Sequence, residues 1–180
     1  MIAQRNPGAK ILAIDISEAA AELGQSNFEE SVYAERLSLH HVDYKSFKYE
    51  NVFDLIVCNP PFFEPNDSLK DTIARQTLEL DAETFLCKSA GFLAENGRIS
   101  VIIPADQAGL YQKAGRAYNL FPVRKIDIYG IQDGEMKRNI LEFSKNRQDL
   151  TVETFVIEKS PRKYSDQYLE LTKEFHVFGK

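Results

Sequence analysis

The sequence has few cysteines, no tryptophan, no glycine-rich loop and no long apolar run. Its two cysteines, Cys58 and Cys87, stand in apolar surroundings without the spacing of metal ligands. This usage argues against a disulfide-stabilised secreted domain and predicts reduced thiols in a cytoplasmic protein. No apolar segment approaches the roughly 20 residues of a membrane helix and no signal peptide is visible, so we expect no membrane association. The three histidines form no ligand pattern, and we expect no bound metal.

The missing glycine loop bears on the fold. No Gly-x-Gly sequence occurs, although folds that bind dinucleotides and related nucleosides place such a loop between their first strand and first helix. Residues 1–8 are instead typical of a helix end followed by a turn, and residues 10–16 predict a buried strand. We therefore interpret residues 1–180 as a single domain that lacks an N-terminal strand and its glycine loop. A sheet that lacks a central strand exposes unpaired backbone groups, so the chain could pair with another copy.

Charge is distributed unevenly along the chain. The formal net charge is −5, but residues 1–110 carry 9 Lys+Arg and 17 Asp+Glu, whereas residues 111–180 carry 13 and 10. The first part is therefore acidic, with a balance of −8, and the second is mildly basic, with a balance of +3. Because contacts to phosphates supply most non-specific affinity for nucleic acids, we expect any nucleic acid to approach the second part.

The most specific stretch of the sequence is an apolar run that stops at two prolines. Phe53–Cys58 is rich in β-forming residues without helical spacing, which predicts a strand buried on both faces. The run ends in Asn-Pro-Pro-Phe-Phe, residues 59–63, and proline cannot donate to a strand ladder, so the strand must stop there. Asn59 is thereby placed at the carboxyl end of a strand, where open α/β sheets bind their ligands.

The residues after this strand suit the activation of a weakly nucleophilic nitrogen. The side-chain oxygen of Asn59 and the carbonyl of Pro60 can both accept hydrogen bonds from one NH2 group, on a base or a carboxamide. This orients the nitrogen lone pair toward an electrophile and stabilises the positive charge that develops. The ring of Phe62 can stack on a planar substrate, and the prolines stiffen the turn. The alternative interpretation is a strand-terminating turn with two packed aromatic residues.

An acid ends the strand predicted over residues 10–16. Asp15 follows the apolar run, and Ser17 is a favourable N-cap for the helix predicted over residues 18–32. A carboxylate here can accept hydrogen bonds from both hydroxyls of a ribose. Ile16 would then cover one face of the adenine. The alternative is an ordinary solvated aspartate at the start of a helix.

A third predicted strand ends in the same way. Residues 37–42 alternate partially and are followed by Asp43 and Tyr44. Because the carboxyl ends of parallel strands share one edge of a sheet, we expect Asp15, Asp43 and Asn59 to lie along one edge. This pattern predicts a cofactor that contains a nucleoside.

The remaining sequence predicts alternating helices and strands. Residues 64–70 predict a polar loop that could act as a lid over the site. The predicted helices cover residues 71–95, ended by Gly97, residues 106–118, and a terminal segment from Ser165. The predicted strands cover residues 98–104, 122–130, 139–145 and 151–158.

The stretch Ile56-Val57-Cys58-Asn59-Pro60-Pro61-Phe62 resembles the Asn-Pro-Pro-(Tyr/Phe) signature of S-adenosylmethionine-dependent amino-methyltransferases. Over nearly all its length the chain resembles the tRNA1(Val) adenine-37 N6-methyltransferase family, including a Tyr-Ser-x-x-Tyr…Leu-Thr…Phe ending at residues 164–175. The resemblance implies an α/β, Rossmann-like class I methyltransferase fold. Its sheet would be mostly parallel with a C-terminal antiparallel strand.

The resemblance also implies three groups of site residues. The residues implied in catalysis are Asn59, Pro60 and Phe62. Those implied in binding S-adenosylmethionine are Asp15, Ile16, Asp43, Tyr44 and Asn59, with Asp15 on the ribose and Asp43 on the adenine amine. Those implied in contact with tRNA are Pro61, Phe63, Arg75, Lys137 and Arg138. Arg75 follows an Ala-Arg pattern of the family, but it could equally be an ordinary surface arginine.

Three functions therefore remain open from the sequence. The first is methyl transfer from S-adenosylmethionine to the N6 amine of an adenine in tRNA, adenine 37 of tRNA1(Val) by the resemblance. The second keeps the chemistry but changes the substrate to guanine N2 of ribosomal RNA or glutamine N5 of a protein. The third is a non-catalytic fragment that binds RNA or a partner chain, which the missing glycine loop favours.

Overall fold

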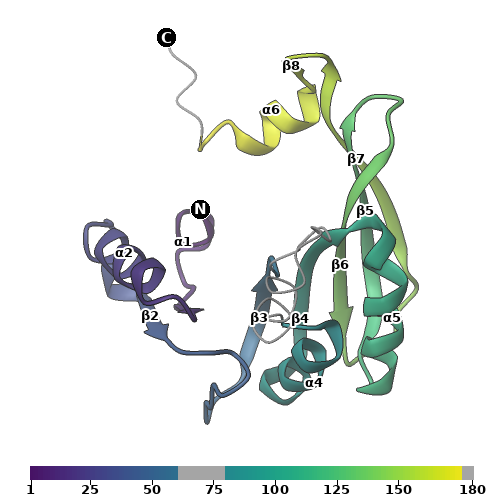
Figure 1. The fold of residues 1–180 in the computed structure, drawn as a ribbon. Coiled ribbons are helices and arrows are strands. Elements are labelled where there is room, and N and C mark those ends of the chain that lie inside the picture. The colour runs from purple at the N-terminus through teal and green to yellow at the C-terminus, as the bar shows by residue number, and fades with distance from the viewer. Residues whose placement is uncertain (61–79, 176–180) are drawn as a thin grey trace, which may run out of the picture. The chain divides into compact units, whose positions relative to one another are not determined.

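The computed structural model describes residues 1–60 and 80–175, and the statements below concern these residues. They divide into two compact units, Met1–Lys48 and Tyr49–Lys180, each of which is described by itself (Figure 1). Within the described ranges no helix is both long and apolar enough to cross a membrane.

The first unit is a two-stranded parallel sheet with a helix packed on it. Its elements are α1 (Ile2–Arg5), β1 (Ile11–Asp15), α2 (Glu18–Glu29), a 3-10 turn (Ala34–Arg36) and β2 (Leu37–His41). β1 and β2 pair in parallel from Ile11 opposite Leu37 to Asp15 opposite His41. Gly24 of α2 lies so close to β2 that an added Cβ would stand 2.6 Å from a methyl of Leu39.

Arg36 ties the start of β2 to the turn before β1. Its guanidinium donates to the carbonyls of Ala3, Asn6 and Ala9 at 2.9, 3.0 and 2.8 Å. A planar guanidinium offers several fixed donors, so one side chain can satisfy carbonyls left open at a helix end. The predicted helix end and turn in residues 1–8 are confirmed, while α2 ends at Glu29, three residues before the expected boundary.

The second unit is a six-stranded mixed sheet. Its strands are β3 (Phe53–Cys58), β4 (Leu93–Pro104), β5 (Phe121–Ile131), β6 (Met136–Ser144), β7 (Thr151–Ser160) and β8 (Lys163–Tyr164). Its helices are α4 (Ala82–Phe92), a 3-10 turn (Ala105–Gln107), α5 (Ala108–Ala117) and α6 (Asp166–Thr172). The strand order is β3-β4-β6-β5-β7-β8.

The pairing of the strands confirms the antiparallel strand that the resemblance implies in the C-terminal part of the sheet. β3 and β4 are parallel, and β5 and β7 are parallel, whereas β6 is antiparallel to both of its neighbours, β4 and β5. The β5–β6 hairpin thus folds its second strand back into the sheet between β4 and β5. The strands and helices predicted between residues 98 and 158 are confirmed within a few residues.

The core of the second unit lies between the sheet and the helices α4 and α5, which cover one face (Figure 1). Alternate residues of β4, namely Ile99, Val101 and Ile103, are fully buried, as the period of a strand requires. Leu141 and Phe143 of β6 are buried beside them. This alternation explains why an almost continuous apolar run forms a strand with one well-packed face.

β3 and β1 are less buried than the sequence predicts. We expected Phe53–Cys58 to be covered on both faces, but Leu55 and Val57 are 50% and 56% exposed. Among the described strands β3 pairs only with β4, and β1 only with β2, so each has an open edge. Residues 11–14 of β1 are half-buried for the same reason. Pairing with another copy through such an edge stays a prediction.

The prediction of one long helix over residues 71–95 is wrong for residues 80–95, the part that the structure describes. Asp81 has an extended backbone (φ −67°, ψ 160°) and caps α4, which ends at Phe92. Residues 95–97 belong to β4, so Gly97 does not end a helix. It permits close packing instead, because an added Cβ would lie 2.7 Å from a methyl of Leu93 and 3.0 Å from the carbonyl oxygen of Phe53.

Candidate active site

The first candidate contact surface is the carboxyl end of β1 in the first unit. Asp15 is exposed, and its Oδ1 accepts a hydrogen bond of 2.8 Å from the amide of Ser17. Its Oδ2 accepts no hydrogen bond from the described residues, so this oxygen can receive a ligand hydroxyl. Ser17 caps α2 as predicted, accepting from the amide of Ala20 at 3.4 Å. Ile16, 48% exposed, offers the apolar surface expected to cover an adenine.

The end of β2 lies beside it. The amide of Val42 donates to the carbonyl of Asp15 at 2.9 Å, which extends the ladder and brings Asp43 next to the end of β1. Asp43 accepts from the amide of Lys45 at 2.8 Å. His41 bonds through Nε2 to the carbonyl of Ile16 at 3.1 Å, a structural role that agrees with the prediction for the histidines. The structure therefore brings together the pair Asp15 and Ile16 and the pair Asp43 and Tyr44.

These residues fit an adenosine moiety. The carboxylates of Asp15 and Asp43, at neighbouring strand ends, supply acceptors for ribose hydroxyls and an amine. The exposed Ile16 directly follows Asp15. In the described residues no group of three or more His, Cys, Asp or Glu side chains could hold a metal ion. The acceptors at the ends of β1 and β2 and the exposed Ile16 suit a cofactor that contains a nucleoside.

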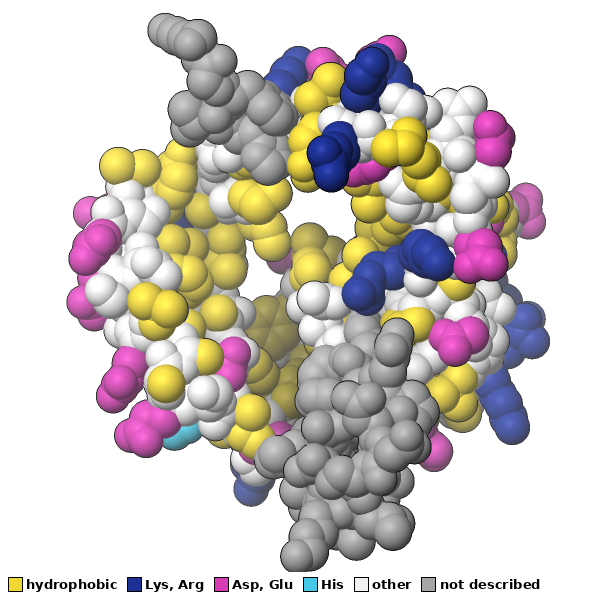
Figure 2. All heavy atoms as spheres, turned by 45° about the horizontal axis from the view of Figure 1, so that its top comes forward, with side chains coloured by type: hydrophobic (Ala, Val, Ile, Leu, Met, Phe, Trp, Pro, Cys, Tyr) yellow, Lys and Arg dark blue, Asp and Glu magenta, His cyan; other side chains and the backbone are white. Residues whose placement is uncertain are grey.

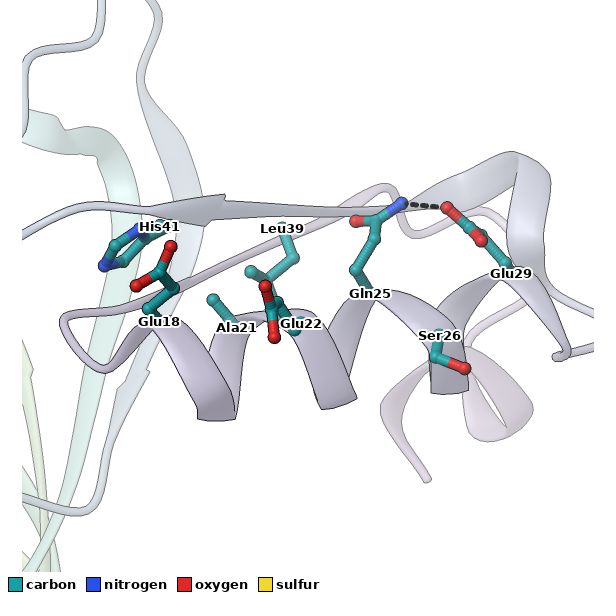
Figure 3. A pocket seen from close by; sticks show the side chains of 8 residues that line it. All are labelled: Glu18, Ala21, Glu22, Gln25, Ser26, Glu29, Leu39 and His41. Atoms are coloured by element: carbon teal, nitrogen blue, oxygen red, sulfur yellow. Dashed lines mark hydrogen bonds between the residues drawn. The ribbon is translucent and has the colours of Figure 1, made fainter.

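A groove of about 550 Å³ lies between α2 and β2 in the same unit (Figure 3). Glu18, Glu22 and Glu29 line it, and Gln25 donates to Glu29 at 2.7 Å. This acidic lining disfavours phosphate. It therefore agrees with the expectation that a nucleic acid approaches the second part of the chain.

The second candidate surface is the carboxyl end of β3. Asn59 is exposed directly after the strand, and Pro60 is buried. Burial of the proline ring anchors the chain beside the exposed carboxamide, which supports the predicted preorganisation. Pro61, Phe62, Phe63 and Arg75, and the predicted lid over residues 64–70, lie outside the described residues.

Two titratable groups, Cys58 directly before Asn59 and Tyr111 of α5, have raised pKa values, and the part of Tyr111 could not be read from the sequence. Burial raises the pKa of Cys58 to about 11, so its thiol is neutral at physiological pH. Tyr111 of α5 is 2% exposed, and burial, followed by the nearby Cys58 and Asp81, raises the pKa of its phenol. The neutral thiol of Cys58 and the neutral phenol of Tyr111 therefore do not act as strong bases at physiological pH.

Lys137 and Arg138 lie at the start of β6, at the same end of the sheet as Asn59. β4 ends at Pro104 directly opposite Arg138, so the carboxyl ends of β3 and β4 meet the amino end of β6. Lys137 is exposed and pairs with Glu135 at 3.2 Å. Within the second unit the register therefore places these two cations at the end of the sheet that carries Asn59.

The cap of α4 supports this site and gives a prediction. Burial acts to raise the pKa of Asp81, but hydrogen bonds from the amide and hydroxyl of Thr84, at 2.8 and 2.7 Å, outweigh it and lower this pKa. The stabilisation is therefore full above the unfolded pKa of about 3.9 and is lost as pH falls through the folded value. We expect Asp81→Ala to cost about 1 kcal/mol at pH 7 and progressively less below pH 4.

Urea unfolding at pH 7 and pH 3 measures this difference. Asp81→Asn, which keeps an N-cap acceptor, is the matched control and should retain most of the stability at both pH values. A cost of Asp81→Ala that does not change with pH would contradict the role of the ionised carboxylate.

A family model described as "Methyltransferase small domain" matches residues 1–113. A relative from a Flavobacteriaceae bacterium, named tRNA1(Val) (adenine(37)-N6)-methyltransferase, is 48% identical over 99% of this chain and 78% of its own length. A relative of the same name from Vibrio campbellii is 33% identical over 98% of this chain and 75% of its own length.

Solved structures of methyltransferases share the fold. A predicted O-methyltransferase from Agrobacterium tumefaciens aligns with a TM-score of 0.73 over 96% of this chain and 81% of its own, at 14% identity. A geranyl diphosphate C-methyltransferase from Streptomyces coelicolor, solved with S-adenosyl-L-homocysteine, aligns with a TM-score of 0.58 over 81% and 66%, at 13% identity.

The strand order and the polar strand ends, together with these likenesses, define a class I S-adenosylmethionine-dependent methyltransferase. The two long matches above 30% identity define the group within that class. The chain belongs to the tRNA1(Val) (adenine(37)-N6)-methyltransferase family.

The position of Asp15 gives a prediction for cofactor binding. We expect Asp15→Ala to weaken S-adenosylmethionine about 10- to 100-fold, because hydrogen bonds to a charged acceptor contribute roughly 1.5–3 kcal/mol. Isothermal titration calorimetry measures the dissociation constant. Asp54→Ala, at an exposed aspartate of β3, is the matched control. Equal affinities of the two variants for the cofactor would contradict the assignment.

Proposed function

We propose that this chain transfers a methyl group from S-adenosylmethionine to the N6 amine of an adenine in tRNA, adenine 37 of tRNA1(Val). The observation that carries the proposal is the exposed Asn59 at the carboxyl end of β3, anchored by the buried Pro60. The family supports it, because the two relatives described above carry this substrate in their names.

The chemistry needs little beyond orientation. S-adenosylmethionine supplies an electrophilic methyl group when bound. The target adenine is turned out of its loop and stacks on Phe62, as flipped bases do on aromatic side chains. Its N6 amine donates to the Asn59 carboxamide oxygen and the Pro60 carbonyl. These acceptors direct the lone pair and stabilise the charge that grows on nitrogen.

Loss of the proton from the methylated nitrogen does not require a strong base. The neutral thiol of Cys58, with a pKa of about 11, cannot act as one at physiological pH. A positively charged, methylated amine releases its proton readily to water. We therefore assign Asn59 and Pro60 a positioning and electrostatic role, with no covalent intermediate.

Methyl transfer from radiolabelled S-adenosylmethionine to unmodified tRNA tests the proposal. Digestion of the labelled product with nuclease or protease separates an RNA substrate from a protein glutamine, and nucleoside analysis separates N6-methyladenosine from N2-methylguanosine. A folded chain that binds no cofactor in calorimetry would instead support a non-catalytic fragment.

The place of action follows from the substrate. We propose that the chain works in the cytoplasm on free tRNA. The thiols of Cys58 and Cys87 are both unpaired, as a reducing compartment requires. Fractionation of cells that express a tagged protein, with tRNA as the marker, tests this.

A further inference from the structure

We propose that the β7–β8 hairpin and the start of α6 form a second tRNA-contact surface, separate from the contact with the target adenine. We call it the tyrosine platform and define it as Arg162, Lys163, Tyr164 and Tyr168. The choice of tRNA as its partner rests on the proposed function. The surface itself rests on ring geometry, charge and strand register.

Two stacked rings form the centre of the platform. The rings of Tyr164 and Tyr168 have centroids 4.5 Å apart and an angle of 23° between their planes. Tyr164 is 41% exposed, although tyrosine has a large apolar ring. An exposed ring that a second ring supports is a rigid surface on which a nucleotide base can stack, and base stacking tolerates any sequence.

Hydrogen bonds hold these rings in place before any ligand arrives. The hydroxyl of Ser165, a residue only 7% exposed, donates to the carbonyl of Val156 and accepts from the amide of Tyr168 at 3.1 Å. The amide of Ser165 donates to the carbonyl of Ile157 at 2.8 Å. Ser165, between the two tyrosines in sequence, therefore attaches the platform to β7, so little ordering remains to be done on binding.

Two cationic residues, Arg162 and Lys163, directly precede Tyr164 in the sequence. Arg162 has a left-handed backbone (φ 63°), and its amide donates to the Glu158 carboxylate at 3.1 Å, which shapes the turn. The exposed side chains of Arg162 and Lys163 form no ion pair with an acid among the described residues. Lys159, in contrast, pairs with Asp166 at 3.0 Å. Arg162 and Lys163 are thus available to phosphates next to an aromatic stack.

β3 and β8 lie at opposite edges of the sheet, but the register brings the platform to the same end as Asn59, where β3, β4, β5 and β7 finish. β4 ends at Pro104 opposite Arg138, and β5 lies between β6 and β7. Glu158, near the end of β7, pairs with Tyr164. Five strand spacings separate β3 from β8, about 24 Å across the sheet at roughly 4.8 Å each, and the register adds an offset along the strands. The separation is therefore at least about seven nucleotides of a stacked strand at 3.4 Å, so the platform meets a part of the RNA beyond the target nucleotide.

The side chains around the tyrosine platform favour RNA as its binding partner. In Figure 2 the end of the second unit that carries β8 and α6 in Figure 1 comes forward. At this end, Lys and Arg side chains are interspersed with hydrophobic ones. An exposed aromatic stack flanked by two cations matches bases and phosphates, which alternate along an RNA strand. The alternative partner is a protein with acidic side chains, and the test below distinguishes it from tRNA.

Direct binding of fluorescent tRNA by the full chain without cofactor, measured by anisotropy at several salt concentrations, tests the platform. We expect Tyr164→Leu to weaken binding about fivefold or more and Tyr164→Phe to stay within about twofold of the wild type, because stacking requires the ring. Arg162→Gln should lower the slope of log K against log salt by about 0.7–0.9. Lys113→Gln, at an exposed lysine of α5, is the matched control for charge and should change neither quantity.

Each result of these measurements either supports the tyrosine platform as a tRNA-contact surface or overturns it. Wild-type affinities and salt slopes for Tyr164→Leu and Arg162→Gln, in variants that melt with the wild type, would overturn it. The same holds if the chain binds no tRNA, or if Lys113→Gln has the same effect as Arg162→Gln. Methyl transfer by the wild type is measured separately. A chain that binds tRNA through the platform but methylates none contradicts the proposed function and not the platform.

Discussion

Asn59→Ala is expected to lower the rate of methyl transfer about 10²- to 10³-fold, the size of effect seen when one preorganised group is removed from a developing charge. The carboxamide oxygen is one of two acceptors for the target amine, so its loss leaves the lone pair poorly directed. Because Asn59 is exposed, its truncation leaves no cavity, and the free energy of unfolding should change little.

The measurement is single-turnover transfer of labelled methyl to saturating tRNA. Asn51→Ala is the matched control, since Asn51 is also an exposed asparagine and precedes the same strand. We expect it to keep the wild-type rate. The effect should appear in the rate at saturating tRNA more than in tRNA affinity, because the interaction strengthens as charge develops. An Asn59→Ala variant with the wild-type rate would refute this role and, with it, the proposed mechanism.

Phe143→Ala is expected to lower the free energy of unfolding by about 3–5 kcal/mol, as removal of a buried aromatic ring usually does. Phe143 lies on β6 and is 0% exposed. Its ring packs against α5, where an added Cβ on Gly115 would stand 2.9 Å from the ring edge. For a chain of this size we expect a fall in melting temperature of about 6–20 °C.

Gly115 makes this prediction sharper. Gly115→Ala should itself destabilise by about 1–3 kcal/mol, because the new methyl would also meet the carbonyl oxygen of Leu120 at 3.1 Å. In a double-mutant cycle with Phe143→Leu the two costs should not add, since both concern one contact. Leu110→Ala on α5, at a residue 57% exposed, is the control and should change stability little. Additive costs would show that the helix and β6 are not packed as described.

Local patterns predicted correctly where two of the elements next to the candidate site begin or end. The prolines after Cys58 end β3, because a residue without an amide hydrogen cannot continue a ladder, and this alone places Asn59 at the strand end. Ser17 caps α2 for an equally local reason. Each of these inferences depends on residues within a few positions of one another.

Other features depend on partners far away in the sequence. The sequence favours a helix over residues 71–95 that ends at Gly97. In the described part, Asp81 instead caps α4, and Gly97 belongs to β4 and lies close to Phe53. The exposure of Leu55 and Val57 depends on which strands pair with β3. Neither partner can be read from the residues that surround these positions.

The places where β1 and β3 stop, and the polar groups that follow them, can be read from the amino-acid sequence. Proline, capping side chains and apolar runs act on the backbone within one or two turns, so their effects survive without knowledge of the fold. The insertion of β6 between β4 and β5 follows from the three-dimensional packing. That packing also brings Arg138 and the stack of Tyr164 and Tyr168 to the end of the sheet that carries Asn59. Strand order depends on packing between distant segments, and many pairings satisfy the same local preferences.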